Sequence, residues 1–229
     1  KVDYDIPTVS SILLSSGELL TNNATVVVNA TGIDGISGVI EQYISGNIPV
    51  QSDTFAWVSA NTTVTLSFAT DDTFNVFVTF RDKAFNESTI SNSYIVIDTI
   101  APSTPVITAP NGGADYVSSS SVQVISGTVT GGADLIFVND STSNVTFASW
   151  DTVWSYTNSF SDGTANVVVY AQDFATNSSP TTGISVAIDT LLPTTDVTAN
   201  VITSNIIQIE FSEWVDGADL TINYTIDNA

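Results

Sequence analysis

Residues 76–88 read VFVTFRDKAFNES, and residues 167–179 read VVVYAQDFATNSS. In each stretch, a run of β-branched and aromatic residues leads into the same polar pattern, D-x-A-x-N-x-S. Short runs of this composition are typical of β-strands. Because the two stretches lie 91 positions apart, they predict a repeated β unit of that length.

A second pattern recurs at the same spacing. The Asp-Thr pairs that begin at Asp98 and Asp189 are also 91 positions apart, and each is followed by a proline, Pro102 or Pro193. The segment Asp5–Thr8 looks like the same junction one unit earlier. The coincidence of these spacings predicts a tandem array of domains.

The repeat predicts three units along the chain. We expect a first domain over residues 1–99, a second over residues 100–190, and an incomplete third β unit over residues 191–229. The short third unit has three interpretations. It is a domain of a longer array cut within this unit, a unit completed by another chain through strand addition or exchange, or a small self-contained cap.

The strand pattern predicts the fold class. Turn signals separate the short β-like runs every eight to twelve residues, and helical periodicity is not sustained anywhere. About seven short strands in about 90 residues fit an immunoglobulin-like (Ig-like) sandwich. We therefore predict an all-β chain of tandem Ig-like β-sandwich domains in an end-to-end rod, with an incomplete third β unit.

The composition excludes several classes of function. The 229 residues include 24 acidic and 3 basic residues, for a formal net charge of −21, and no His, Cys or Met. The chain therefore lacks the side chains that imidazole or thiolate catalysis requires, and it lacks the ligands of transition-metal sites. Nucleic-acid binding needs a basic surface, which this chain cannot form. The apolar runs are too short for a membrane-spanning helix, so we expect no membrane insertion.

A pair of carboxylates remains as candidate catalytic machinery, because such pairs hydrolyse glycosides. Here nearly all the acidic residues fall in turns between short strands, on units too small for a deep groove. A catalytic site is also rarely duplicated in register in every module. We therefore expect that the chain is not an enzyme.

The two motifs together resemble the tandem Ig-like domains of large bacterial and archaeal cell-surface proteins. In that family a strand leads into D-x-A-G-N-x-S and a last strand leads into D-T-x-A-P, which stand here at residues 82–88 and 98–102. Phe85 and Thr176 occupy the usual Gly position. The resemblance implies an extracellular, cell-surface location and an adhesin or surface-layer type of protein. It also implies neighbouring Ig-like domains of the same or identical chains as partners, with surface glycans as further candidates.

Aspartate outnumbers glutamate 19 to 5. Asp is a compact oxygen ligand for Ca²⁺, which takes about six to eight oxygens in irregular geometry. Because a loop and a linker of a sandwich can lie at one end of it, we expect Ca²⁺ at each interdomain joint, where it stiffens similar surface arrays. The residues that recur in step with the repeat are Asp82, Asn86 and Asp98 in one set, and Asp173, Asn177 and Asp189 in the other.

The same aspartates have a simpler interpretation. Asp is favoured in turns because its carboxylate accepts hydrogen bonds from nearby backbone N–H groups. Asp82 and Asp173 would then serve their own loops, Asp98 and Asp189 would serve the linkers, and the remaining acids would form a solvated surface.

Two further residue types bear on function. Trp57 and Trp154 lie in strand-like alternation and are expected in the core, whereas Trp150 and Trp214 are better candidates for exposure, at a domain interface or against a sugar. N-x-[ST] sequons, the acceptor sites of a glycoprotein, occur at Asn23, Asn29, Asn61, Asn86, Asn139, Asn144, Asn177 and Asn223.

These observations predict a non-enzymatic, extracellular structural or adhesive segment, a Ca²⁺-stiffened Ig-like rod that spaces or assembles a cell-surface structure. One alternative is a self-assembling subunit of a filament or lattice, joined by strand exchange through the third unit. Another is an accessory carbohydrate-binding or spacer module of a secreted hydrolase.

Overall fold

The computed structural model describes residues 2–51, 53–140, 144–148, 153–193, 198–203 and 206–210. In this part of the chain the regular structure is β-strand, apart from two 3₁₀ turns, η1 (Ser15–Gly17) and η2 (Asn111–Gly113). No helix among these residues is long and apolar enough to cross a membrane. The predicted all-β fold class is confirmed.

The first sandwich contains two sheets. The smaller sheet has the strand order β1-β3-β6 and the larger has β2-β8-β7-β4-β5. The strands are β1 (Thr8–Leu14), β2 (Leu20–Thr21), β3 (Thr25–Ile33), β4 (Val39–Gly46), β5 (Trp57–Ser59), β6 (Val64–Ser67), β7 (Asp72–Asp82) and β8 (Ser91–Ile97).

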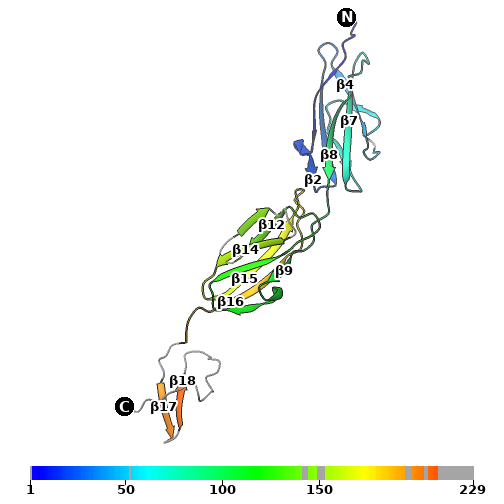
Figure 1. Cartoon of the computed structure of the whole chain (residues 1–229). Helices are drawn as coiled ribbons and strands as arrows, with labels where there is room; N and C mark the ends of the chain where they lie inside the picture. The colour runs from blue at the N-terminus through cyan, green and yellow to red at the C-terminus, as the bar shows by residue number, and fades with distance from the viewer. Residues whose placement is uncertain are drawn as a thin grey trace.

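The second sandwich repeats this arrangement strand for strand, with sheets β9-β11-β14 and β10-β16-β15-β12-β13. The two sandwiches follow one another end to end (Figure 1). The strands are β9 (Val106–Ala109), β10 (Tyr116–Ser118), β11 (Val122–Thr128), β12 (Leu135–Asn139), β13 (Asn144–Ala148), β14 (Val153–Ser159), β15 (Gly163–Gln172) and β16 (Thr182–Ile188).

The expected third unit is represented by one antiparallel pair, β17 (Thr198–Thr203) and β18 (Ile206–Glu210). The strand expected at residues 220–224 lies outside the described residues. The same is true of Trp150 and Trp214.

The first strand of each sandwich changes sheet, which the sequence did not predict. β1 pairs with β3, and the turn η1 then leads into β2, which runs parallel to β8. In the second sandwich η2 joins β9 to β10 in the same way. The change of direction uses left-handed backbone at Ser16 and Gly112, with φ of 65° and 66°. Each sandwich therefore has eight strands rather than seven, because its first strand is divided in two.

Alternation along the strands separates core from surface. In β7 the side chains of Val76, Val78 and Phe80 are buried, and the residues between them face outward. β15 alternates in the same way. Because both sheets of each sandwich turn one face inward, each sandwich has its own hydrophobic core.

The two described tryptophans have different environments. Trp154 is 3% exposed and lies in the second core, as predicted. The expectation that Trp57 is a core residue is wrong, because its side chain is half-buried. Trp57 pairs with Tyr43, and the two rings lie 5.5 Å apart. The neighbours of Tyr43 along β4 are both buried, so Tyr43 and its cross-strand partner face outward.

Gly32 permits the packing of Phe80 in the first core. A Cβ at position 32 would lie 2.5 Å from Cγ of the Phe80 ring. We expect Gly32→Ala to lower the free energy of unfolding by about 1–3 kcal/mol through overpacking, measured by denaturant unfolding. Gly35→Ala is the control, because a Cβ there meets nothing within 4 Å. Equal unfolding midpoints for the two variants would contradict this account of the core.

Candidate functional site

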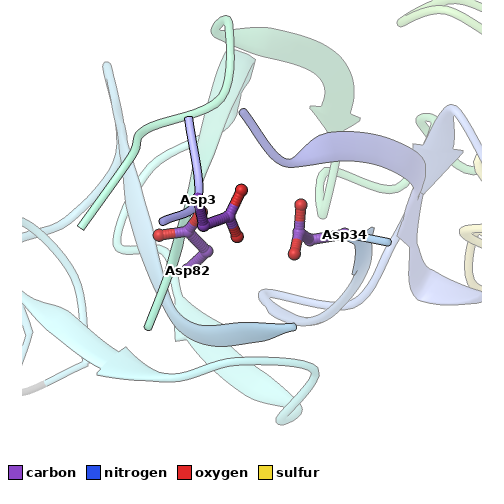
Figure 2. A group of neighbouring side chains, drawn as sticks. All are labelled: Asp3, Asp34 and Asp82. Atoms are coloured by element: carbon purple, nitrogen blue, oxygen red, sulfur yellow. The ribbon is translucent and has the colours of Figure 1, made fainter. Parts of the chain in front are cut away.

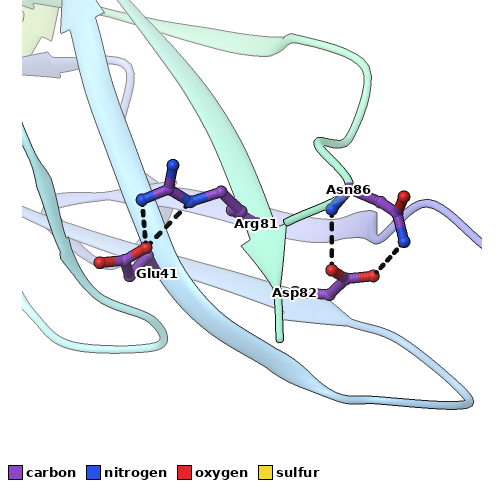
Figure 3. Close-up of polar contacts among 4 residues, drawn as sticks. All are labelled: Glu41, Arg81, Asp82 and Asn86. Carbon is purple, nitrogen blue, oxygen red and sulfur yellow. Dashed lines mark hydrogen bonds and ion pairs between the residues drawn. The ribbon is translucent and has the colours of Figure 1, made fainter. Parts of the chain in front are cut away.

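The two D-x-A-x-N loops make the same hydrogen bonds. The backbone N and the Nδ2 of Asn86 donate to Oδ1 and Oδ2 of Asp82, both at 2.8 Å (Figure 3). Asn177 makes the same two bonds to Asp173, at 2.8 and 2.9 Å. Both acceptors are buried, with Asp82 0% and Asp173 6% exposed. The aspartate of the motif therefore closes the loop, and the amide nitrogen of the asparagine faces its carboxylate.

The backbone of these loops is left-handed at the fourth position of the motif, where the D-x-A-G-N-x-S pattern has Gly. Phe85 has a φ of 65° and Thr176 a φ of 71°. Gly adopts this conformation without steric cost, whereas a residue with a Cβ does not. Both loops therefore keep a strained residue in a conformation that suits Gly.

Each loop contacts the linker that enters its own sandwich. Nδ2 of Asn177 donates to the backbone carbonyl of Asp98 at 2.8 Å. In the first sandwich, Nδ2 of Asn86 lies 3.1 Å from the carbonyl oxygen of Asp5 and 3.3 Å from that of Asp3. This defines an entry end of each sandwich, where the preceding linker meets the D-x-A-x-N loop, and an exit end opposite.

The expected grouping of Asp98 with the loop of the first sandwich is therefore wrong. β7 and β8 are antiparallel, and the start of β7 pairs with the end of β8. Asp98, which follows β8, must then lie at the exit end, away from Asp82 at the end of β7. β15 and β16 are antiparallel in the same way, so Asp189 lies at the exit end of the second sandwich, away from Asp173.

A different aspartate holds the linker at each exit end. Asp71 accepts hydrogen bonds from the backbone N and the Oγ1 of Thr99, both at 2.9 Å. Asp162 accepts the same two bonds from Thr190, at 2.9 and 2.8 Å. Neither residue belongs to the two repeated motifs, although Asp71 and Asp162 are themselves 91 positions apart, which is the signal that identifies them.

The junction aspartates form local turns. Asp3, Asp98 and Asp189 each stand four residues before a proline. Oδ1 of each accepts a hydrogen bond from the backbone N two residues later, at 2.9, 3.2 and 3.2 Å respectively. These contacts agree with the interpretation of the aspartates as turn-forming residues, and they make Asp3 the counterpart of Asp98.

Asp3, Asp34 and Asp82 converge at the entry end of the first sandwich. One carboxylate oxygen of each lies within 4.8 Å of the others, and the three side chains turn toward one another (Figure 2). Asp3 comes from the entering linker, Asp34 from the loop between β3 and β4, and Asp82 from the end of β7. Of the three, Asp82 alone is among the residues predicted from the sequence, because Asp3 and Asp34 both stand outside the repeated motifs.

Among the described residues, no basic side chain forms an ion pair with these three carboxylates. Asp3 is 9% exposed, and its Oδ2 is buried with no hydrogen-bond partner. Among the described residues the ion pair found is that of Arg81 with Glu41, on the outer face of the sheet (Figure 3). Leaving a carboxylate oxygen buried and unpaired is costly. A cation would remove this cost.

The spacing of the three carboxylates fits Ca²⁺. Oxygen ligands lie about 2.3–2.6 Å from this ion, so two ligands on opposite sides are separated by about 5 Å at most. The 4.8 Å limit on the carboxylate oxygens is within that range. Ca²⁺ binding by the residues named from the sequence (Asp82, Asn86, Asp98, Asp173, Asn177 and Asp189) stays a prediction.

The loop backbone holds Asp34 in place. Its Oδ1 accepts hydrogen bonds from the N–H groups of Gly38, Ser37 and Ile36, at 2.7, 2.8 and 3.1 Å. These bonds, the one from Gly38 most of all, hold the pKa of the Asp34 carboxyl below its usual value, against the opposing effect of desolvation. Asp34 is therefore ionised at neutral pH and already oriented.

Two of the sequons lie in these loops. The amide nitrogen of Asn177 donates both to Asp173 and to the carbonyl of Asp98, which uses both of its hydrogens. A glycan on this nitrogen would replace one of them. We therefore expect Asn177, and Asn86 by the same argument, to stay unmodified in the folded protein.

Solved structures with the same fold include fibronectin(III)-like modules of Clostridium thermocellum CbhA. They are 14% identical, with a TM-score of 0.52 over 80% of this chain and 94% of that one. An intimin fragment in complex with the intimin-binding domain of its translocated receptor is 13% identical, with a TM-score of 0.47 over 82% and 67%. Chicken CNTN1 FN1–FN3 domains are 12% identical, with a TM-score of 0.42 over 78% and 66%.

No protein-family model and no curated protein matches the chain. The likeness to the CbhA modules supports a tandem of Ig/fibronectin III-like β-sandwiches. At this level of identity it shows the fold alone.

The contact of Asn177 with the linker yields a first test of the site. Asn177→Ala leaves acceptors on Asp173 and Asp98 unpaired, and we expect it to lower the unfolding free energy of the second sandwich by about 1–3 kcal/mol. Asn22→Ala is the control, because it removes one exposed 3.3 Å bond to Thr176 and should change stability by less than about 0.5 kcal/mol. Denaturant unfolding measures both, and an equal effect would contradict the assigned role.

The left-handed position yields a second test. Thr176→Gly removes backbone strain at a φ of 71°, and we expect the unfolding free energy to rise by about 0.5–1 kcal/mol. Ala175→Gly, at a buried neighbour without left-handed backbone, should instead lower it. Thermal unfolding of the two variants gives the comparison, and a loss of stability in Thr176→Gly would show that the loop is unstrained.

Proposed function

We propose that this chain is a non-enzymatic segment of an extracellular surface protein, an Ig-like rod that spaces or assembles a surface structure. The observation that supports the proposal best is the hydrogen bond from Asn177 to the carbonyl of Asp98, which ties the second sandwich to the linker. A spacer must hold the parts on either side of it at a fixed distance, so its joints must resist bending.

The linker between the sandwiches is held from both sides. Thr99 is bound to Asp71 of the first sandwich, and the adjacent Asp98 is bound to Asn177 of the second. The backbone N of Asp98 also donates to the carbonyl of Thr21, at 3.0 Å. Two consecutive linker residues are therefore bound to different sandwiches. This arrangement leaves little freedom for a hinge between the sandwiches at this point.

Ca²⁺ is the proposed cofactor of this rod. A formal charge of −21 makes the compact state repel itself, and a bound divalent cation lowers that repulsion locally. A ligand that binds only the folded state also adds stability, about 2.7 kcal/mol at 100 times the dissociation constant.

Small-angle X-ray scattering of the full chain tests the proposed rod. We expect wild type to scatter as an extended monomer with one dominant interdomain arrangement. The double variant Asp71→Ala/Asn177→Ala, which releases the linker on both sides, should broaden the distance distribution. An equally broad wild-type distribution would contradict the stiff joint, and a dimeric or larger mass would favour assembly by strand exchange.

A second candidate function is an accessory carbohydrate-binding module. It is favoured by the half-buried Trp57 and Tyr43 on the outer face of the first sandwich, beside the Arg81 guanidinium 4.3 Å from the Trp57 ring centre. If it holds, retention on an immobilised polysaccharide should be lost in Trp57→Ala and kept in Ile90→Ala, which alters an exposed apolar residue outside the strands. No retention of wild type would exclude this role for the matrix used.

A further inference from the structure

We infer that the two entry ends are unequal: Asp3, Asp34 and Asp82 bind one Ca²⁺ in the first sandwich, whereas the joint between the sandwiches closes without metal. The inference rests on the proposed rod function for its biological purpose, and on the geometry alone for the site itself. It departs from the sequence-based expectation of one Ca²⁺ at every joint.

The three carboxylates have free acceptor capacity toward one another. Oδ2 of Asp3 is buried and unpartnered. All three backbone hydrogen bonds to Asp34 end on Oδ1, which leaves Oδ2 available. Each oxygen of Asp82 accepts a single bond from Asn86 and can accept a further interaction. The three carboxylates lie close together (Figure 2), so together they offer at least three anionic ligands.

Solvent can supply the remaining ligands. A hollow lined by Tyr4, Asp5, Ile6 and Asp34 opens beside the group. Ca²⁺ accepts water among its six to eight or so oxygen ligands and tolerates irregular geometry. Mg²⁺ demands nearly ideal octahedral geometry with shorter bonds, about 2.0–2.1 Å, which carboxylates from three separate segments do not easily provide. The site therefore favours Ca²⁺.

The second sandwich has glycine at the position that corresponds to Asp34. Thr8, after Pro7, pairs with Ile33, and Asp34 follows. Ser103, after Pro102, donates its backbone N–H to the carbonyl of Thr130, and Gly131 follows. Gly131 has a φ of 79°, a left-handed backbone conformation in which a side chain is strained, and a Cβ there would also lie 2.9 Å from Oγ of Ser103. Asp34 therefore has no counterpart at this position of the loop.

Asp134, the acid of the same loop in the second sandwich, does not complete a similar group of three acids among the described residues. Asp134 Oδ2 accepts a hydrogen bond from the backbone N of Phe174, at 2.9 Å. Among the described residues, the group of Asp3, Asp34 and Asp82 is the one set of three acids that meets the spacing of a metal site. The hydrogen bond from Asn177 to the carbonyl of Asp98 connects the linker and the second sandwich instead, and the exposed 3.3 Å bond from Asn22 to Thr176 is a weaker contact beside it.

Unequal entry ends would separate two mechanical roles. Removal of Ca²⁺ would loosen the segment around Asp3, because the three carboxylates would repel one another and the hydrogen bonds from Asn86 would oppose this repulsion alone. The joint around Asp98 would keep its hydrogen bonds and its geometry. Extracellular calcium modules bind with dissociation constants of about 10⁻⁴–10⁻³ M, so such a response would occur at extracellular concentrations.

Calorimetric titration of the EDTA-treated full chain with Ca²⁺ tests the inference. Asp34→Asn removes one charge but keeps Oδ1 as acceptor for the loop N–H groups, so the loop should still fold, which circular dichroism checks. We expect this variant and Asp3→Asn to weaken the site at least tenfold. The matched controls Asp134→Asn and Asp98→Asn, at the second entry end, should bind Ca²⁺ within twofold of wild type.

Several results would overturn the inference. These are the absence of Ca²⁺ binding by wild type, unchanged binding by Asp34→Asn, equal weakening by Asp98→Asn, or equal affinity for Mg²⁺. X-ray scattering measured with and without Ca²⁺ tests the proposed stiff rod separately from the Ca²⁺ site. A flexible joint combined with the expected titration would refute the rod and leave the site standing, whereas a stiff joint without Ca²⁺ binding would do the reverse.

Discussion

The arrangement of the two sandwiches depends on the side-chain amide of Asn177. Its nitrogen has two hydrogens, one directed to the buried carboxylate of Asp173 and one to the backbone carbonyl of Asp98. The first bond holds the loop and the second holds the linker, so a single planar group connects the loop with the joint. Asn86 performs the same role for the segment that enters the first sandwich.

The direction of the strands explains why the joint forms with the next domain. The motif loop follows one strand of an antiparallel pair and the linker follows the other, so the two leave a sandwich at opposite ends. A linker can then meet a motif loop only in the domain that comes after it. The repeated pattern therefore marks residues that lie at the joint, but it does not tell which copies of the motif the joint connects.

Charge has different roles at the two entry ends. In the second sandwich the buried Asp173 is satisfied by the N–H groups of Asn177, and left-handed Gly131 stands at the position of Asp34. In the first sandwich Asp34 adds a third acid, and Oδ2 of Asp3 has no partner. The same scaffold can thus hold a linker through hydrogen bonds alone or through a proposed cation, depending on one loop residue.

The repeat, the β fold and the recurrence of Asp82, Asn86, Asp173 and Asn177 in their loops can be predicted from the sequence, because alternation and turn chemistry are local and recur in register. The division of the first strand, the outward position of Trp57 and the pairing of Asn177 with Asp98 come from the tertiary structure. It also brought Asp3 and Asp34 to Asp82, across 79 and 48 positions of the chain respectively. These contacts depend on which ends of antiparallel strands meet, and no local pattern records that.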